Sequence, residues 1–191
     1  MKDSAGETPR ILVDVDGVLN LSKPHVKCNV GYCRCHPGWV RAFGYSNGQK
    51  FRLGLTPRHG SLLRGLAADT GAILTWYTTW NEDANLYVAR KAALPQLPVV
   101  PVPRVPPPLA EIFHERGEGW GAWKAQKLAP QAAWPFVWFE DEPDARAEAI
   151  RHIRVPHKVI TVDPGTGLTA EHIAEARGWL QNFRKDEEDA R

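Results

Sequence analysis

The sequence predicts an α/β fold in which a central parallel sheet is covered by helices on both faces. Apolar runs alternate with helical patterns along the chain, which is the order expected for a parallel sheet. The first run, Ile11–Val13, is apolar at every position, as in a strand buried on both faces. The chain has 191 residues, 43% of them apolar and 24% charged, which is enough to bury one ordinary core. We therefore expect a single domain over residues 1–191.

Each expected strand is an apolar run, and helical patterns lie between these runs. The strands are expected at Ile11–Val15, Ala72–Tyr77, Pro98–Val102, Pro135–Phe139 and Lys158–Val162. Threonine favours the N-cap and proline the first helical position, so the first helix is expected from Thr56-Pro57 to about Ala68. Asn81 similarly caps a helix expected to reach about Ala93. The other helices are expected at Trp120–Leu128, Glu142–Ile153 and Thr169–Phe183.

Three segments fall outside this alternation. Residues 21–55 are far too many for an ordinary loop between a strand and a helix, and their Asn47-Gly48 pair is typical of a β-hairpin turn. We expect a small β-hairpin flap over the C-terminal edge of the sheet, and no large cap domain. Residues 101–113 are rich in proline and are expected to be an extended surface connector. The tail from about residue 185 to 191 is expected to be frayed.

Composition excludes several classes of protein. The formal net charge of +2 is too small to identify a polyanionic partner. No stretch approaches the roughly 20 apolar residues of a membrane span, and the N-terminus has no apolar signal core. Three cysteines, an odd number, do not form a disulfide framework. We expect a reduced, cytoplasmic protein that does not contact a membrane.

Polar residues follow the expected strands at the edge where a parallel sheet gathers its strand ends. Asp14 and Asp16 follow the first strand, Thr78 and Thr79 follow the second, and Glu140 and Asp141 end a later one; Lys124 lies near the start of a helix. Together they offer carboxylates, a hydroxyl and an ammonium around one pocket. Hard oxygen ligands suit Mg²⁺, and the donors suit the oxygens of a phosphoryl group.

These residues resemble, in type and order, the four motifs of the haloacid dehalogenase (HAD) superfamily of phosphatases and phosphotransferases. The resemblance implies a three-layer Rossmann-like HAD fold. It implies that Asp14 is the nucleophile that forms an aspartyl-phosphate and that Asp16 is the general acid and base. Thr78 would hold a phosphoryl oxygen and Lys124 would stabilise the negative charge. Mg²⁺ would be held by Asp14, by the backbone carbonyl of Asp16, and by Asp141 together with Glu140.

A narrower resemblance is to the small HAD domains of "Swiss army knife" RNA-repair proteins. It is carried by DVDGVLN, TTWNEDAN, the Trp123-Lys124 pair, the strand end WFED and the late VDPGTGLT. It implies a phosphomonoester hydrolase that acts on the phosphorylated end of an RNA or DNA strand. Four cations of the flap could contact the strand: Arg34, Arg41, Lys50 and Arg52. The alternative function is a non-catalytic HAD-like module that binds a metal or a phosphate.

Several of these residues also have a purely structural interpretation. Asp14 and Asp16 could cap a turn, Lys124 could be a solvated helix lysine, and Glu140-Asp141 could cap the following helix. Thr79 could replace Thr78 as the phosphate-binding hydroxyl. A further cluster of histidines and cysteines could hold zinc, although its spacing lacks the usual Cys-x-x-Cys knuckle and favours packing cysteines instead: His25, Cys28, Cys33, Cys35 and His36.

Overall fold

The computed structural model describes residues 8–21, 31–32, 38–116 and 119–189. Its centre is a four-stranded parallel sheet with the strand order β5-β1-β6-β7. The strands are β1 (Arg10–Val13), β5 (Ile73–Trp76), β6 (Phe136–Glu140) and β7 (His157–Thr161). Residue Val13 of β1 pairs with Trp76 on one side and with Phe139 on the other. Both neighbours of β1 therefore end beside it, which confirms the predicted convergence of strand ends.

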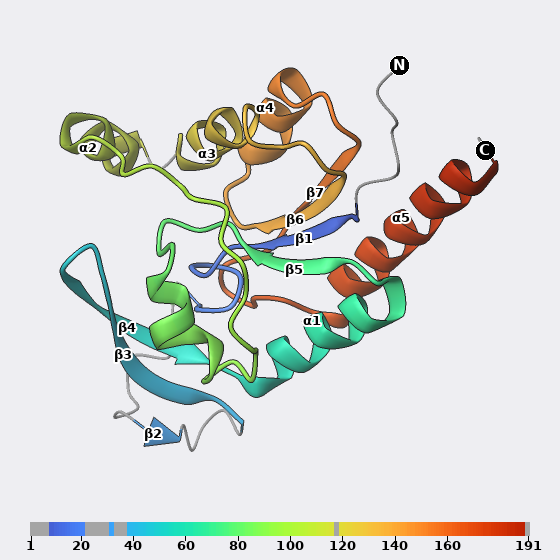
Figure 1. The fold of residues 1–191 in the computed structure, drawn as a ribbon. Helices are drawn as coiled ribbons and strands as arrows, with labels where there is room; N and C mark the ends of the chain where they lie inside the picture. Colours follow the sequence, from blue (N-terminus) through green and yellow to red (C-terminus); the bar gives the residue numbers. More distant parts are fainter. Residues whose placement is uncertain (1–7, 22–30, 33–37, 117–118, 190–191) are drawn as a thin grey trace.

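Helices cover the sheet on both faces and complete a three-layer fold (Figure 1). On one face, α1 (Pro57–Thr70) packs on α5 (Ala170–Asp189); on the other, α3 (Trp120–Leu128) packs on α4 (Ala145–His152). The side chains of β1 alternate between the two layers, because Ile11 and Val13 belong to one apolar core and Leu12 to the other. All three are fully buried, as their unbroken apolar run predicts. The three-layer Rossmann-like fold is therefore confirmed.

The first helix has the ends that its sequence predicts. The Thr56 hydroxyl accepts a hydrogen bond from the N–H of Arg58, and Pro57 occupies the first turn. Gly71 ends the helix in the left-handed conformation, with φ of 62°. The helix runs to Thr70, slightly beyond the predicted Ala68.

A small antiparallel sheet stands beside the central one, as predicted for the flap (Figure 1). Its strands are β2 (Gly31–Tyr32), β3 (Val40–Ser46) and β4 (Gln49–Leu55). Asn47 and Gly48 connect β3 to β4 with φ values of 51° and 78°, the two positive angles that a tight hairpin turn requires. The flap residues 22–30 and 33–37 lie outside the described residues.

The prediction of a strand at Pro98–Val102 is wrong. Only Val99 forms an isolated bridge, to Trp76, and the segment continues as an irregular chain. Proline has no N–H to donate to a sheet, and Pro98 and Pro101 flank the bridge. Two of the valines that favoured a strand, Val100 and Val102, are instead buried beneath the α3 and α4 layer, together with Val105.

The helix predicted at Asn81–Ala93 is only partly correct. The segment contains turns around a short π-helix, η1 (Asn85–Ala89). Asn81 does not cap it: its φ is 47°, and its side chain instead bonds the backbone of Val102. The amide accepts from the Val102 N–H at 2.8 Å and donates to the Val102 carbonyl at 3.0 Å.

Three other boundaries differ from the prediction. Helix α2 (Pro107–Arg116) occupies part of the segment expected to be an extended connector, because prolines are tolerated in the first turn of a helix. Helix α4 begins at Ala145 rather than Glu142. Helix α5 continues to Asp189, so residues 185–189, expected to be frayed, are helical.

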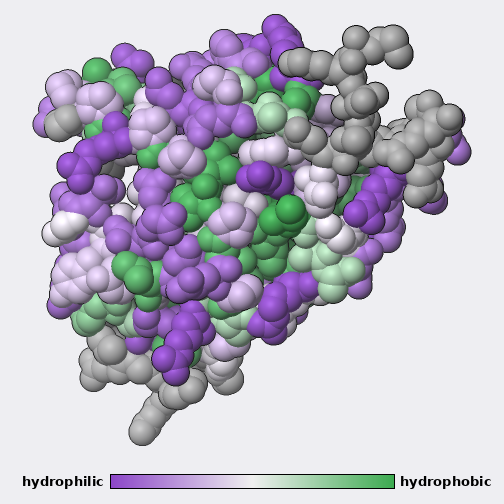
Figure 2. Space-filling view, in the orientation of Figure 1, coloured by the Kyte–Doolittle hydropathy of each residue, from purple (hydrophilic) through white to green (hydrophobic). Residues whose placement is uncertain are grey.

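The outer surface of the helices is polar. Figure 2 shows hydrophilic side chains over most of the viewed face and apolar ones gathered in its middle. Among the described residues, no helix is both long and apolar enough to cross a membrane.

Candidate active site

Asp14 lies at the end of β1, where the strand enters a tight loop. Its N–H donates to the carbonyl of Phe139, so the residue still lies level with the neighbouring strand β6. Its side chain is buried, with 4% of the residue exposed. The loop then turns at Gly17, which has φ of 71° and closes on Asn20 through an N–H to carbonyl bond of 2.7 Å. Only a glycine adopts this conformation without strain.

Lys124 brings an ammonium group to this carboxylate from helix α3. Its Nζ lies 2.9 Å from Oδ2 of Asp14, and 2.6 and 2.5 Å from the two oxygens of Glu140. The backbone carbonyl of Lys124 accepts a bond from the Tyr77 hydroxyl, which ties the helix to the end of β5. Burial alone would lower the pKa of Lys124, but Asp14 and Glu140 outweigh it and raise the pKa, so the side chain is charged.

Three carboxylates meet around this single ammonium. Oxygens of Asp14, Glu140 and Asp141 all lie within 4.8 Å of one another. Burial, followed by the charge of Asp14, raises the pKa of Asp141 to about 7. Burial also raises the pKa of Glu140 above its usual range, against the attraction of Lys124. The three carboxyl groups therefore resist being ionised together beside a single ammonium, and a divalent cation would favour their ionised form; their hard oxygen donors fit a magnesium ion.

Gly17 allows Asp141 to enter this group. A Cβ atom at position 17 would lie 2.0 Å from Oδ2 of Asp141, well inside van der Waals contact. The absence of a side chain at Gly17 therefore lets the Asp141 carboxylate lie directly against the loop that carries Asp14 and Asp16. Gly17 therefore has two roles: it allows the loop to turn, and it leaves room for the carboxylate of Asp141.

Asp16 points into the cleft and is oriented by two donors. The indole N–H of Trp80 donates to its Oδ2 at 2.7 Å, and the Asn20 amide donates to its Oδ1 at 2.8 Å. The residue is exposed to the cleft, where protein atoms of the cleft walls surround it. This desolvation raises the pKa of Asp16; the two hydrogen bonds oppose the rise and the charge of Asp14 adds to it. A carboxyl group of this kind can hold a proton for donation.

The cleft above these residues has a volume of about 690 Å³. Its walls are the hairpin tip, the segment 102–105 and helix α2, and its base includes Asp14, Asp16, Lys124 and Asp141. Arg104 donates to the Asn47 side chain at 3.1 Å and so joins the two walls. Thr79 is among the lining residues, whereas Thr78 is fully buried at the end of β5.

The structure therefore brings together five predicted residues, Asp14, Asp16, Lys124, Glu140 and Asp141, with both threonines at the adjoining strand end. Sequence reasoning missed the roles of Asn20, Trp80 and Tyr77. Asn20 also accepts a bond from the N–H of Gly54, at 2.8 Å, and so joins the Asp16 loop to the hairpin. The sequence feature that could have indicated Asn20 is its position six residues after Asp14, in a loop where asparagine favours a turn. The flap cation Arg34 lies outside the described residues, as do all five members of the proposed zinc cluster: His25, Cys28, Cys33, Cys35 and His36.

Comparison with known proteins identifies the family of the domain that carries these residues. A family model described as the HAD domain in Swiss Army Knife RNA repair proteins matches residues 10–173. The match includes every candidate residue from Asp14 to Asp141. No curated protein and no solved structure matches the chain.

Proposed function

The chain belongs to the family of HAD domains in Swiss Army Knife RNA repair proteins, and we propose that it is a Mg²⁺-dependent phosphomonoester hydrolase acting on the end phosphates of nucleic-acid strands. The observation that carries the proposal is the buried contact of Lys124 with Asp14 and Glu140 at the base of an open cleft. This contact fixes a carboxylate nucleophile beside a positive charge, as phosphoryl transfer requires.

In the first half of the reaction, a carboxylate oxygen of Asp14 forms a bond to phosphorus as the bond from phosphorus to the ester oxygen breaks. Asp16 donates its proton to the departing oxygen, which leaves as an alcohol. In the second half, Asp16 takes a proton from a water molecule that attacks the phosphorus of the aspartyl-phosphate. Inorganic phosphate leaves and the Asp14 carboxylate is restored. The raised pKa of Asp16 supports its role as the acid of the first half.

Lys124 stabilises the charge on the Asp14 carboxylate and on the phosphoryl oxygens during both halves. Asp14 and Asp141, with the backbone carbonyl of Asp16, would hold Mg²⁺, and Glu140, predicted as a further ligand, lies in the same group of carboxylates. Glu140 supports this group by orienting Lys124, since both of its oxygens contact the ammonium. When bound, the ion supplies positive charge that offsets the excess of carboxylates and polarises the phosphoryl group.

The substrate assignment rests on the family and on the shape of the cleft. The family consists of HAD domains in RNA repair proteins, which supports a phosphorylated nucleic-acid strand as the substrate. The described residues include no large cap domain over the cleft, so a polymer end can enter it. A small phosphate ester would contact few groups besides the base of the cleft. It should therefore be a weaker substrate than an oligonucleotide end, because remote contacts supply part of the binding energy.

The test is hydrolysis of a 3′-phosphorylated oligonucleotide, a 5′-phosphorylated oligonucleotide and a small phosphate ester with Mg²⁺. Asp14→Asn should lower the rate of hydrolysis at least about 10³-fold while leaving the protein folded, because an amide is a poor nucleophile. Asp69→Asn, the same change at an exposed position on α1, is the control and should retain activity. Full activity in Asp14→Asn would refute the mechanism. No hydrolysis of any ester by the wild type would favour a binding module.

A further inference from the structure

Charge is distributed unevenly along this chain. Residues 17–68 contain eight Lys and Arg residues and no Asp or Glu, although the whole protein has a net charge of only +2. This stretch includes the β3–β4 hairpin, and the acidic residues lie elsewhere in the fold. The hairpin is therefore a cationic element on a nearly neutral molecule.

One face of the hairpin combines these cations with aromatic rings. Phe43 pairs with Arg52 and Tyr45 with Lys50 across the two strands, and side chains of paired residues lie on the same face of a sheet. All four are exposed, with 37% of Phe43 and 46% of Tyr45 accessible to solvent. The ammonium of Lys50 lies 4.0 Å from the ring centre of Phe43, so on this face a cation is in contact with an aromatic ring.

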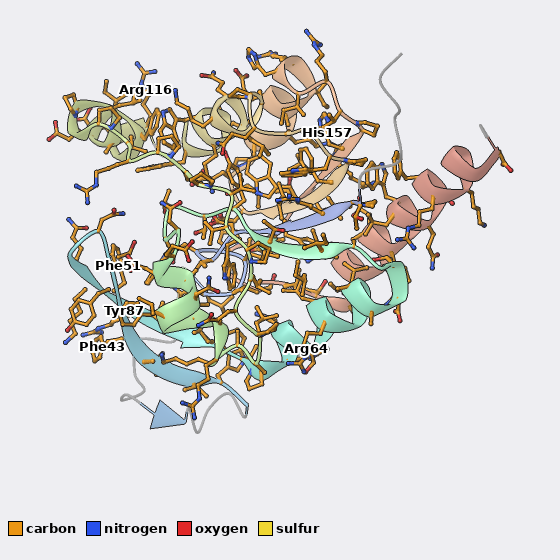
Figure 3. The ribbon with its side chains drawn as sticks, in the orientation of Figure 1. Phe43, Phe51, Arg64, Tyr87, Arg116 and His157 are labelled. Atoms are coloured by element: carbon orange, nitrogen blue, oxygen red, sulfur yellow. The ribbon has the colours of Figure 1, made fainter. Side chains whose placement is uncertain are left out.

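The opposite face of the hairpin packs on the rest of the protein. Leu53 is buried there, and the ring of Phe51 lies 5.3 Å from that of Trp80, the residue that orients Asp16. The hairpin is therefore anchored by that face, and not by the exposed rings of Phe43 and Tyr45. Figure 3 shows Phe43, Phe51 and Tyr87 gathered at the hairpin, and Arg116 and His157 away from it, at α2 and at the edge strand β7. The hairpin thus has one face toward the cleft and one toward solvent.

We propose that the solvent face of the hairpin, formed by Phe43, Tyr45, Lys50 and Arg52, binds the single strand whose terminal phosphate enters the cleft. We name these four residues the hairpin platform. The proposal deepens the proposed function and rests on it for the identity of the strand. Exposed rings can stack with bases of any sequence, and the cations can contact the phosphates between them. A face without any acidic residue has the charge complementary to a polyanion.

The hairpin platform is also continuous with the candidate active site. Residues at the hairpin tip, Ser46, Asn47 and Gln49, line the cleft above Asp14. A strand lying along the hairpin would therefore reach the cleft over its tip. Because stacking and phosphate contacts do not read base edges, binding should prefer single strands over duplexes and tolerate changes of sequence.

Binding of a fluorescently labelled, unphosphorylated single-stranded oligonucleotide, measured by anisotropy, tests the hairpin platform without requiring catalysis. The double variants Phe43→Ala/Tyr45→Ala and Lys50→Ala/Arg52→Ala should each weaken binding at least about tenfold. The second should also reduce the slope of log affinity against log salt by about 1 to 1.5, as expected when two phosphate contacts are lost from a single strand. RNA and DNA versions of the oligonucleotide show which sugar is preferred.

The matched control is Arg146→Ala/Arg154→Ala, which removes the same charge from exposed positions on and just after α4, on the other side of the sheet. It should leave the affinity within about twofold and the salt slope nearly unchanged. Thermal unfolding confirms that each variant is folded. Hairpin variants that bind like the wild type, or a control that loses as much affinity, would overturn the proposal. So would wild-type protein that binds phosphatidylserine vesicles but no oligonucleotide.

Hydrolysis by the wild type separates this proposal from the proposed function. If the wild type hydrolyses no phosphate ester but its oligonucleotide binding depends on the hairpin, the hydrolase proposal fails and the platform stands. If it hydrolyses phosphate esters but its oligonucleotide binding does not depend on the hairpin, only the platform is overturned.

Discussion

His59 is a buried histidine whose environment disfavours its charged form. It lies on α1 with 3% of its surface exposed, and its Nδ1 has no hydrogen-bond partner in the described part of the chain. The ring of Trp39 packs against it edge to face, with ring centres 5.4 Å apart. Burial, with a smaller contribution from the charge of Arg58, lowers the pKa of His59 from 6.5 to about 4, against a backbone hydrogen bond with Leu19 that raises it. The folded protein therefore holds His59 neutral where the unfolded chain would be protonated.

We expect the contribution of His59 to stability to fall as the pH decreases from 6.5 to about 4, because in that window the unfolded state binds a proton at His59 that the folded state does not. This contribution lowers the free energy of unfolding by up to about 3 kcal/mol. The raised pKa values of Asp16, Glu140 and Asp141 act in the opposite direction over the same range, so the His59 contribution is read as a difference between variants. The measurement is urea unfolding across this pH range. His59→Leu should gain stability relative to the wild type as the pH decreases through this window, whereas His152→Gln, at an exposed position on α4, should follow the wild type. A His59→Leu variant that also follows the wild type would assign the effect to other groups.

Thr78 and Thr79 offer a second test at the scale of single residues. Thr78 is fully buried at the end of β5, and its oxygen accepts a bond of 3.4 Å from the N–H of Trp80. A hydroxyl that is excluded from water stabilises a phosphoryl oxygen within its reach more strongly than a solvated hydroxyl does. We expect Thr78→Val to lower kcat/KM at least about tenfold, and Thr79→Val to lower it less. Steady-state kinetics on a phosphorylated oligonucleotide would show the reverse ranking if Thr79 binds the phosphate.

The acidic and basic residues of the site could be predicted from the sequence because of the topology of the sheet. Parallel strands end at one edge, so charged residues after several apolar runs must meet there, as Asp14 and Glu140 do. The groups that orient them could not be predicted in the same way. Trp80 and Asn20 contact Asp16 from two different loops, and such contacts depend on three-dimensional packing rather than on spacing along the chain.

At the scale of elements, Asn81 holds the cleft wall in place. Its side chain makes two hydrogen bonds to the backbone of Val102, in the irregular segment that leads to Arg104 and α2. Asn81→Ala would leave the N–H and carbonyl of Val102 without these partners. It should lower the free energy of unfolding by about 1–3 kcal/mol. It should also raise KM more than it lowers kcat, since Asn81 and Val102 both line the cleft away from Asp14.

Denaturant unfolding and steady-state kinetics check this prediction. Asn85→Ala is an instructive comparison, because the Asn85 side chain also bonds backbone, at Leu97, but does not line the cleft. It should destabilise the protein with little change in KM. If the two variants change KM equally, the hydrogen bonds between Asn81 and Val102 affect KM through the general stability of the protein and not through the cleft wall.

Proline accounts for the elements that sequence reasoning assigned incorrectly. The valines near residue 100 have the apolar character of a strand, but prolines at 98 and 101 prevent continuous pairing beyond the Val99 bridge. The same property hid helix α2, because its starting prolines suggested an extended chain. Proline is compatible with the first turn of a helix and incompatible with its interior. Its effect therefore depends on where the helix begins, which the sequence of residues 101–113 does not show.

The whole molecule places an excess of negative charge at the edge of an otherwise apolar sheet. Strands that are buried on both faces deliver Asp14, Glu140 and Asp141 to one point, and Lys124 balances only part of their charge. Like charges at this distance oppose the folded state. A divalent ion that binds the folded protein and not the unfolded chain should therefore stabilise the entire domain.

We expect Mg²⁺ at about 100 times its Kd to raise the free energy of unfolding by about 2.7 kcal/mol. For a domain of this size, that corresponds to an increase in Tm of roughly 5–10 °C. Asp141→Asn should abolish most of the increase, because it removes a charged ligand while keeping the shape of the side chain. Asp69→Asn, which removes an equal charge from the surface of α1, should show the wild-type increase. Differential scanning fluorimetry across a Mg²⁺ titration, starting from protein treated with EDTA, measures all three proteins. An increase in Asp141→Asn equal to that of the wild type would place the metal elsewhere in the molecule.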